Sequence, residues 1–171
     1  MVYIIVEGAT DKALVINILS DKKENTDFKF LGLKGIDSVK KTIENLEELG
    51  LSQHAYFAIV DADNSFDVRN KEMQALTQAN NVPFYIFPNH QDNGDLETLL
   101  LSHVNEDNKI IRCFDTYQTC VGQNIDNKAK LYAYTTLEHN KRPEQYIKEL
   151  PLNDDFDTLR QQLQTLFKGT E

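Results

Sequence analysis

In the N-terminal part of the chain, short runs of apolar residues alternate with segments whose apolar residues recur at helical spacing. The runs are rich in β-branched and aromatic residues and end in turn-forming residues, which is typical of buried strands. They lie at residues 2–6, 28–33, 56–60 and 82–87. Because strands that alternate with helices favour an α/β fold, we expect a four-stranded, mainly parallel sheet of the Rossmann-like kind with helices on both faces.

Capping residues indicate where the intervening helices begin and end. Thr10 is a suitable N-cap for the first helix. Gly50 follows the second helix in the way that a C-terminal glycine does. Asp95 is placed to begin a helix after the fourth strand, which completes a fourfold strand–helix repeat.

From about residue 105 onward the pattern becomes purely helical. Apolar residues at helical spacing predict one helix between 110 and 121 and a last one between 156 and 167. We therefore expect residues 1–104 to form the α/β domain and residues 105–171 to form an α-helical extension packed on it. Cys113 and Cys120 fall in the first of these helices, where we expect them to be buried as small hydrophobic residues.

Composition narrows the functional classes. The 171 residues carry a formal net charge of -9 and a pI of about 4.9, which argues against binding nucleic acid through overall charge. This leaves open a local basic patch, or a metal ion that bridges acidic residues to phosphate. No apolar stretch of this sequence is long enough to span a membrane, and we expect no signal peptide because the first residues lack a basic segment followed by a long apolar run. Two sparse cysteines suit a reducing compartment, so we expect a cytoplasmic protein without membrane contact.

Acidic residues follow two of the predicted strands. Glu7 and Gly8 end the first strand, and Asp61-Ala62-Asp63 ends the third. In open α/β sheets, ligands bind at the carboxyl ends of the strands, and neighbouring strands lie about 4.8 Å apart. If the first and third strands are neighbours, Glu7 and Asp61 can share one metal ion. Because oxygen-only ligands select Mg²⁺ or Mn²⁺, the sequence predicts a cation that clamps phosphate oxygens during phosphoryl transfer.

The motifs at these two strand ends resemble those of the Toprim domain, the topoisomerase–primase module. This module also occurs in nucleases of the overcoming-lysogenization-defect type and in small recombination-repair proteins. The motifs read Val6-Glu7-Gly8-x-x-Asp11 and Asp61-x-Asp63. After the fourth strand, Gly94-x-Leu96-Glu97 is similar to a family of small Toprim-like prokaryotic proteins. The resemblance covers about residues 2–104.

The Toprim resemblance implies a role for each matching residue. Glu7 matches the family's general acid/base, and Asp61 and Asp63 match its Mg²⁺ ligands. Asp11 and Glu97 resemble additional acidic residues of the nuclease branch, which hold a second ion. The resemblance therefore implies an Mg²⁺- or Mn²⁺-dependent nuclease that acts on DNA or RNA phosphodiesters.

Other interpretations of the same residues stay open. Asp61 and Asp63 can simply cap a turn and the next helix, and Asp11 and Glu97 can complement helix N-termini. The chain can also be a catalytically silent Toprim-like protein that acts through a protein partner or by self-association. A further alternative is a phosphatase of the haloacid-dehalogenase type, with Asp61 as the nucleophile of Asp-x-Asp-x-Ser.

Five more residues are candidates for contacting substrate. His90 lies in the loop after the fourth strand, and four basic residues of the extension surround a pair of tyrosines. These are Lys128, Lys130, Lys141 and Arg142. Such a stretch forms either a phosphate-contacting surface or a solvated helix face.

Overall fold

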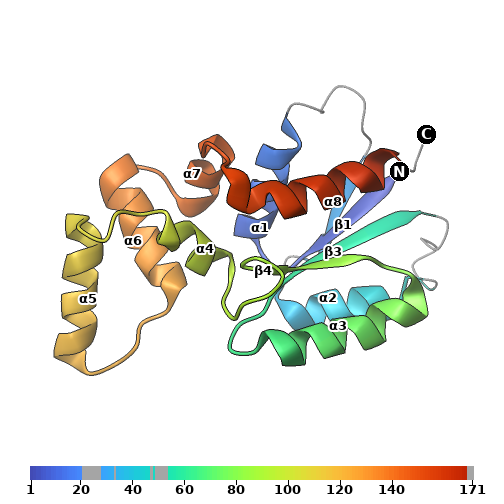
Figure 1. The fold of residues 1–171 in the computed structure, drawn as a ribbon, viewed down its shortest axis with the longest axis horizontal. Helices are drawn as coiled ribbons and strands as arrows, with labels where there is room; N and C mark the ends of the chain where they lie inside the picture. The colour runs from blue at the N-terminus through green and yellow to red at the C-terminus, as the bar shows by residue number, and fades with distance from the viewer. Residues whose placement is uncertain (21–27, 33, 47, 49–53, 169–171) are drawn as a thin grey trace.

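The structure is a computed structural model that describes residues 1–20, 28–32, 34–46, 48 and 54–168. Its strands are β1 (Val2–Val6), β2 (Phe28–Gly32), β3 (Ala55–Asp61) and β4 (Phe84–Phe87). They form one sheet in the order β2-β1-β3-β4, and all of them are parallel (Figure 1). The predicted α/β fold is confirmed, and the strand order places β1 beside β3 in the middle of the sheet.

Both faces of the sheet are covered, which explains why its central strands are apolar along their whole length. In β1, Val2, Ile4 and Val6 belong to one buried cluster, whereas Tyr3 and Ile5 belong to the other. This alternation follows from the two-residue period of a strand. The strand therefore contributes to two separate cores.

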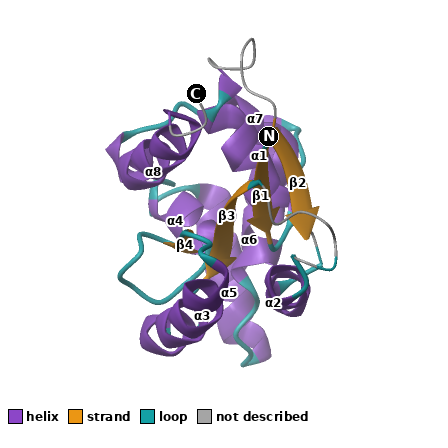
Figure 2. Ribbon diagram, turned by 90° about the vertical axis from the view of Figure 1, so that its right-hand side faces the viewer, coloured by secondary structure: helices purple, strands orange, loops and turns teal. Residues whose placement is uncertain are grey.

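Helices form the outer layers (Figure 2). On one face lie α2 (Ile36–Glu44) and α3 (Phe66–Asn80), which contribute Val39, Ile43 and Met73 to the buried cluster there. The other cluster is completed by a larger group of helices. They are α1 (Ala9–Ile18), α4 (Leu96–Ser102), α7 (Pro143–Glu149), the short 3₁₀ helix η2 (Asp154–Phe156) and α8 (Asp157–Lys168).

The C-terminal helices share a core with the sheet. The two remaining helices are α5 (Lys109–Val121) and α6 (Asn127–His139). Residues of the extension and of the strands occur together in one buried cluster, with the extension contributing Leu131, Ile147, Phe156, Leu159 and Leu163. The Asn17 side chain also donates hydrogen bonds to the carbonyls of Ile147 and Leu150, each at 2.8 Å. The boundary at residues 104 and 105 stays a prediction.

The prediction that the cysteines are buried is wrong, because both Cys113 and Cys120 are exposed. Their helix, α5, lies at the periphery of the molecule against α6 (Figure 1). With so little covering it, α5 also leaves Tyr117 58% and Val121 41% exposed. Within the described residues, none of the helices combines the length and apolar character needed to cross a membrane.

The predicted helix starts are partly correct. Asp95 is the N-cap of α4, and its side chain accepts a hydrogen bond from the first turn. Thr10, in contrast, lies inside α1, and the N-cap is Gly8. A glycine can take this place because a side chain from the first turn bonds back to its N–H. Leu33 and Gly50, predicted as the ends of a strand and a helix, lie outside the described residues.

Candidate functional site

The parallel pairing of β1 with β3 brings Glu7 next to Asp61. Val6 lies opposite Ile59 in the register, so the residue that follows β1 reaches the end of β3. The Glu7 carboxylate accepts a hydrogen bond from the backbone N–H of Asp61 at 2.8 Å. The two strand ends that the sequence singled out are therefore neighbours.

Two further carboxylates reach the same place from helix N-termini. Asp11 lies in the first turn of α1, where its Oδ2 accepts the Gly8 N–H at 2.7 Å. Glu97 lies in the first turn of α4, and its Oε1 accepts a hydrogen bond from the Thr10 hydroxyl at 3.3 Å. Only 4% of Asp11 and 2% of Glu97 is exposed. Burial this complete is rare for Asp and Glu without an ionic partner.

Asp61 completes the group at the end of β3. It is 5% exposed, and its Oδ1 accepts the backbone N–H of Leu96, in the first turn of α4, at 3.1 Å. This contact joins the end of the third strand to the helix that follows the fourth. We refer to Glu7, Asp11, Asp61 and Glu97 as the acidic cluster.

Burial raises the pKa of every member of the acidic cluster. It raises the pKa of Asp61 to about 9, and the negative charges of the other three members add to this shift. Burial also raises the pKa of Asp11 to about 7, although the Gly8 N–H opposes the change. For Glu7 and Glu97, burial outweighs the hydrogen bonds that lower the pKa.

The acidic cluster lacks a direct ionic partner within the described part of the chain. None of the ion pairs found there involves any of its four carboxylates. A buried carboxyl group in this situation either keeps its proton or requires a cation. The negative charge of the acidic cluster therefore has to be neutralised by protons or by a bound cation.

Lys128 is the residue of the extension whose charge acts on the acidic cluster. Burial opposes its charged form, but attraction to Glu97, Asp61 and nearby Asp95 raises the pKa of Lys128 above its ordinary value. The position of Lys128 is fixed by Asn127, the residue before it in α6. The Asn127 side-chain amide donates a hydrogen bond to the Thr98 hydroxyl of α4 at 3.1 Å. The packing of α6 on α4 thus brings a cation to the edge of the cluster.

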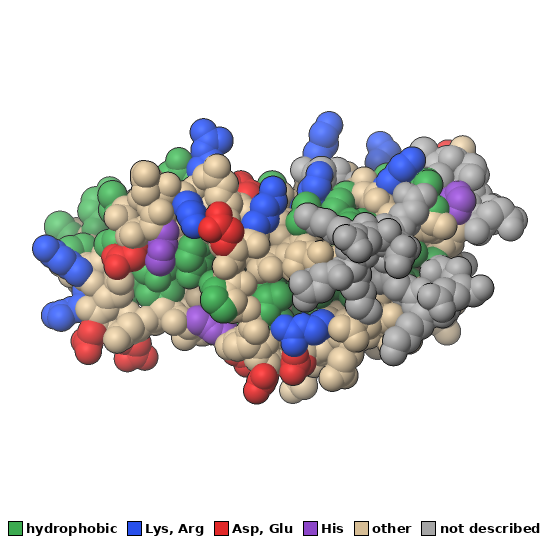
Figure 3. Space-filling model, turned by 90° about the horizontal axis from the view of Figure 1, so that it is seen from above, with side chains coloured by type: hydrophobic (Ala, Val, Ile, Leu, Met, Phe, Trp, Pro, Cys, Tyr) green, Lys and Arg blue, Asp and Glu red, His purple; other side chains and the backbone are tan. Residues whose placement is uncertain are grey.

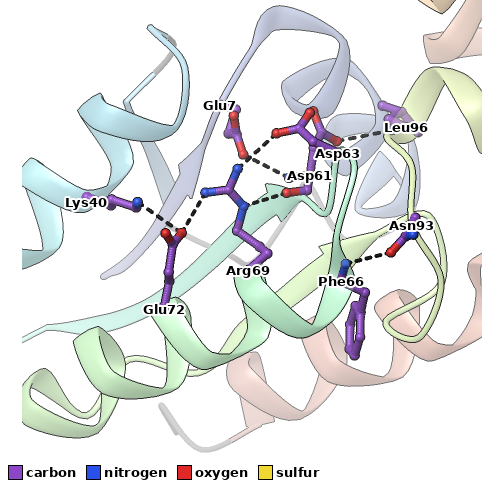
Figure 4. Close-up of polar contacts among 9 residues, drawn as sticks. All are labelled: Glu7, Lys40, Asp61, Asp63, Phe66, Arg69, Glu72, Asn93 and Leu96. Atoms are coloured by element: carbon purple, nitrogen blue, oxygen red, sulfur yellow. Dashed lines mark hydrogen bonds and ion pairs between the residues drawn. The ribbon is translucent and has the colours of Figure 1, made fainter.

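Asp63 is arranged differently from Asp61. Its φ of 51° lies in the left-handed region, and its backbone exchanges two hydrogen bonds with Gly94, at 2.7 and 2.8 Å. The side chain is 54% exposed and pairs with Arg69 of α3 at 2.9 Å (Figure 4). The left-handed turn interrupts the strand, so Asp63 does not repeat the environment of Asp61. Its predicted role as a metal ligand stays a prediction.

Arg69 is the centre of a second group of charges. Its Nε donates to the backbone carbonyl of Asp61 at 2.8 Å, and its Nη1 donates to Glu72 at 3.1 Å. Glu72 in turn pairs with Lys40 of α2 at 3.0 Å. We refer to Lys40, Asp63, Arg69 and Glu72 as the Arg69 network.

His90 is built into the loop after β4. Its Nδ1 accepts the backbone N–H of Ile86 at 3.1 Å, and its ring stacks on Tyr85 with the ring centres 5.4 Å apart. Burial lowers the pKa of His90, which favours the neutral ring that this hydrogen bond requires. One ring nitrogen therefore serves the fold, and the predicted contact of His90 with substrate is untested.

Two of the basic candidates in the extension are held in local ion pairs. Lys130 pairs with Asp115, and Lys141 pairs with Glu149 at 2.6 Å. Arg142 precedes α7 as its N-cap residue. On the face of the molecule drawn in Figure 3, basic side chains are scattered among acidic and hydrophobic ones. These observations favour Lys128 over the other basic candidates as the residue nearest to the chemistry.

The contacts that Arg69 and Thr10 make at the site are not predicted by the sequence. Arg69 lies six residues after Asp63, early in the next helix, and this proximity is the one signal for it. Thr10 is predicted only as a helix cap, whereas its hydroxyl contacts Glu97 across two helices. This second contact depends on how α1 meets α4, which local sequence patterns do not specify.

The donor chemistry of the acidic cluster fits a hard divalent cation, since every side-chain ligand is a carboxylate oxygen. In the described ranges, however, no three Asp, Glu, His or Cys side chains stand in a ready-made metal cage. Backbone N–H groups and a hydroxyl hold the carboxylates instead. Binding a cation therefore requires at least one carboxylate to turn.

Comparison with known proteins gives one match. A family model described as "Protein of unknown function (DUF3226)" matches residues 1–168. No curated protein and no solved structure matches the chain.

Proposed function

The chain belongs to the DUF3226 family, and from that premise we propose that its acidic cluster is a Toprim-like site for Mg²⁺ or Mn²⁺. The proposed activity is phosphoryl transfer on DNA or RNA phosphodiesters, most simply a nuclease reaction. One observation carries the proposal. Three buried carboxylates and the half-buried carboxylate of Glu7 meet at the carboxyl ends of β1 and β3 without an ion-pair partner among the described residues.

The cation would be held mainly by Asp61, with Asp11 and Glu97 beside it. These are the most deeply buried carboxylates, and the raised pKa of Asp61 measures how strongly that position favours neutralisation. When bound, the cation supplies a clamp for phosphate oxygens and stabilises charge on the leaving oxygen.

Glu7 is suited to move a proton. It is the least buried member of the acidic cluster, so its carboxyl can reach a reacting oxygen. Burial raises the pKa of Glu7, and a general acid/base works best when its pKa lies near the working pH. Glu7 therefore takes a proton from the attacking oxygen or gives one to the leaving oxygen.

Lys128 supports a polyanionic substrate. The net charge of -9 disfavours nonspecific contact with nucleic acid, so attraction has to be local. The raised pKa keeps Lys128 charged beside Glu97 and Asp61, and its ammonium group can contact a phosphate held at the cluster.

The test combines cation binding with cleavage, using Asp61→Asn as the variant. The asparagine oxygen can still accept the Leu96 N–H, so this substitution removes charge while it preserves the local hydrogen bond. We expect wild-type protein to bind Mn²⁺ in calorimetry and to cut labelled DNA or RNA only with Mg²⁺ or Mn²⁺. Asp61→Asn should lose both properties, with cleavage reduced about 100-fold or more.

The matched control is Asp107→Asn, which changes an exposed loop carboxylate and should behave as wild type. Wild-type protein that binds neither cation would overturn the proposal. Cation binding without cleavage of any nucleic acid would favour the silent, partner-dependent alternative. Hydrolysis of small phosphate esters that Asp61→Asn abolishes would favour the phosphatase alternative.

A further inference from the structure

Arg69 uses its guanidinium group to make three contacts, which join α3 to the end of β3 and to the turn that follows it. Its side chain is only 11% exposed although it belongs to α3, a helix of the outer layer. Nε donates to the Asp61 carbonyl at the end of β3, and Nη2 donates to the Asp63 carboxylate at 2.9 Å. Nη1 donates to Glu72 of the same helix. Figure 4 shows the guanidinium lying between Glu72 and the strand end, on the side of Glu7.

The backbone around Asp63 is fixed, so only its side chain is free to choose a partner. Two hydrogen bonds to Gly94 hold the main chain, and the Asp61 carbonyl is held by Arg69 itself. The Asp63 side chain is 54% exposed and makes one ion pair, with Arg69. An ion pair with one exposed partner contributes little net free energy, so a divalent cation nearby can compete for this carboxylate.

Arg69 also acts on the acidic cluster through its charge. Its positive charge lowers the pKa of Glu7, whereas the negative charge of Asp63 raises it. Both residues therefore lie within electrostatic reach of the cluster without being members of it. A positive charge at this distance disfavours the entry of a cation.

We propose that Arg69 is a positioning residue that holds Asp63 out of the acidic cluster, and that Asp63 transfers from Arg69 to the cation when Mg²⁺ or Mn²⁺ binds. This inference rests on the proposed function. The described residues do not contain a ready-made set of three metal ligands. This exchange supplies the additional ligand. Once Asp63 is released, Nη2 of Arg69 is available to the phosphate that arrives with the cation, while Nε and Nη1 keep their contacts.

The exchange makes a prediction of unusual sign. Removing an arginine normally weakens an anion-binding site, but Arg69→Gln should tighten Mn²⁺ binding, because it frees Asp63 and removes a repelling charge. We expect the dissociation constant from calorimetry to fall about threefold or more. Asp63→Asn should raise the dissociation constant, and the double variant should lose the gain that Arg69→Gln gives.

Two further variants separate charge from geometry and from general destabilisation. Arg69→Lys keeps the positive charge but cannot make the same three contacts, so it should fall between wild type and Arg69→Gln. Arg160→Gln breaks an ion pair with Asp157 in the extension and should leave Mn²⁺ binding unchanged. Thermal unfolding without metal confirms that each variant is folded.

The outcomes distinguish this inference from the proposed function. If wild-type protein binds no Mn²⁺, the proposed function fails and this inference fails with it. If wild-type protein binds Mn²⁺ but Arg69→Gln binds it less tightly or equally, only the exchange is wrong. If Arg69→Gln does not fold, Asp63→Asn decides alone, and binding equal to that of wild type overturns the exchange.

Discussion

The acidic cluster and the Arg69 network begin two residues apart on the same strand end, yet they treat their carboxylates in opposite ways. In the cluster, Asp61 is buried without an ion pair to any residue that the structure describes, and burial raises its pKa to about 9. In the network, Glu72 is exposed and paired, and the hydrogen bond from Lys40 leads the effects that lower its pKa. A carboxylate with a partner contributes to the fold. A carboxylate buried without one is costly to the fold, which is expected where a ligand is to bind.

The sharpest test of this comparison is to remove the acid that we propose to be catalytic, Glu7, and keep its hydrogen bond. Glu7→Gln can still accept the Asp61 N–H but cannot exchange a proton. We expect cleavage to fall by about 10²- to 10⁴-fold, while calorimetry detects nearly unchanged Mn²⁺ binding. Glu106→Gln, in an exposed turn, serves as the control. Loss of cation binding in Glu7→Gln would instead make Glu7 a ligand.

The pH dependence of stability tests the buried side of the comparison. A carboxyl group whose pKa is higher in the folded state binds more protons when folded, so it stabilises the fold less as pH rises. The stability that protonated Asp11 contributes is lost as pH rises to about 7, and that of protonated Asp61 is lost as pH rises to about 9. Metal-free protein should therefore lose about 5 °C or more in Tm between pH 5 and pH 9.

Two additions make this measurement specific. Saturating Mg²⁺ should flatten the pH profile, because the cation replaces the protons. Asp61→Asn should flatten the profile in part without metal, since the variant no longer buries the charge of Asp61 while Glu7, Asp11 and Glu97 remain. A wild-type Tm that rises steadily from pH 5 to pH 9 would show that the cluster is not buried as an uncompensated group.

Gly94 links the two regions, because its backbone pairs with Asp63 and it precedes the helix that carries Glu97. Its φ is +129°, and an added Cβ would lie 3.0 Å from the Thr98 hydroxyl oxygen. Gly94→Ala should therefore reduce the free energy of unfolding by about 1–3 kcal/mol in urea denaturation. Gly122→Ala, at φ +66° in open space, measures the backbone cost without a clash and should cost less.

The smallest effect is expected on the paired side of the comparison. Glu72→Gln removes ion pairs with Lys40 and Arg69 whose carboxylate is 41% exposed. We expect a loss below about 1 kcal/mol in the free energy of unfolding, shrinking further at high salt. A loss larger than that of Gly94→Ala would mean that the Arg69 network supports the fold more than an exposed pair can.

The sequence predicted the elements with strong local signals. The run of apolar residues at 2–6 is β1 without adjustment. The acidic strand ends after β1 and β3 are neighbours, which the α/β pattern allowed but did not determine. The burial of Asp11 and Glu97 could not be read in this way, because first-turn carboxylates usually face solvent. Their burial results from the convergence of the first turns of α1 and α4, which the hydrogen bond between Thr10 and Glu97 joins although these residues lie far apart in the chain.

The division between Asp61 and Asp63 was also hidden from the sequence. An Asp-x-Asp motif places both carboxylates on one face only while the strand continues. The left-handed conformation at Asp63 and the pairing with Gly94 end that regularity. The spacing of hydrophobic residues encodes neither this conformation nor this pairing. Arg69 can be recognised as the partner of Asp63 only once the turn is known.

The hydrogen bond between Thr10 and Glu97 joins residues 87 positions apart, and this separation links ligand binding to the completeness of the chain. A nascent chain that has not yet produced α4 carries Glu7, Asp11 and Asp61 but lacks both Glu97 and the Leu96 N–H. A cation bound by the finished cluster would favour the assembled fold over such partial forms by mass action. The concentration of that cation would then help to set how much of the protein is folded.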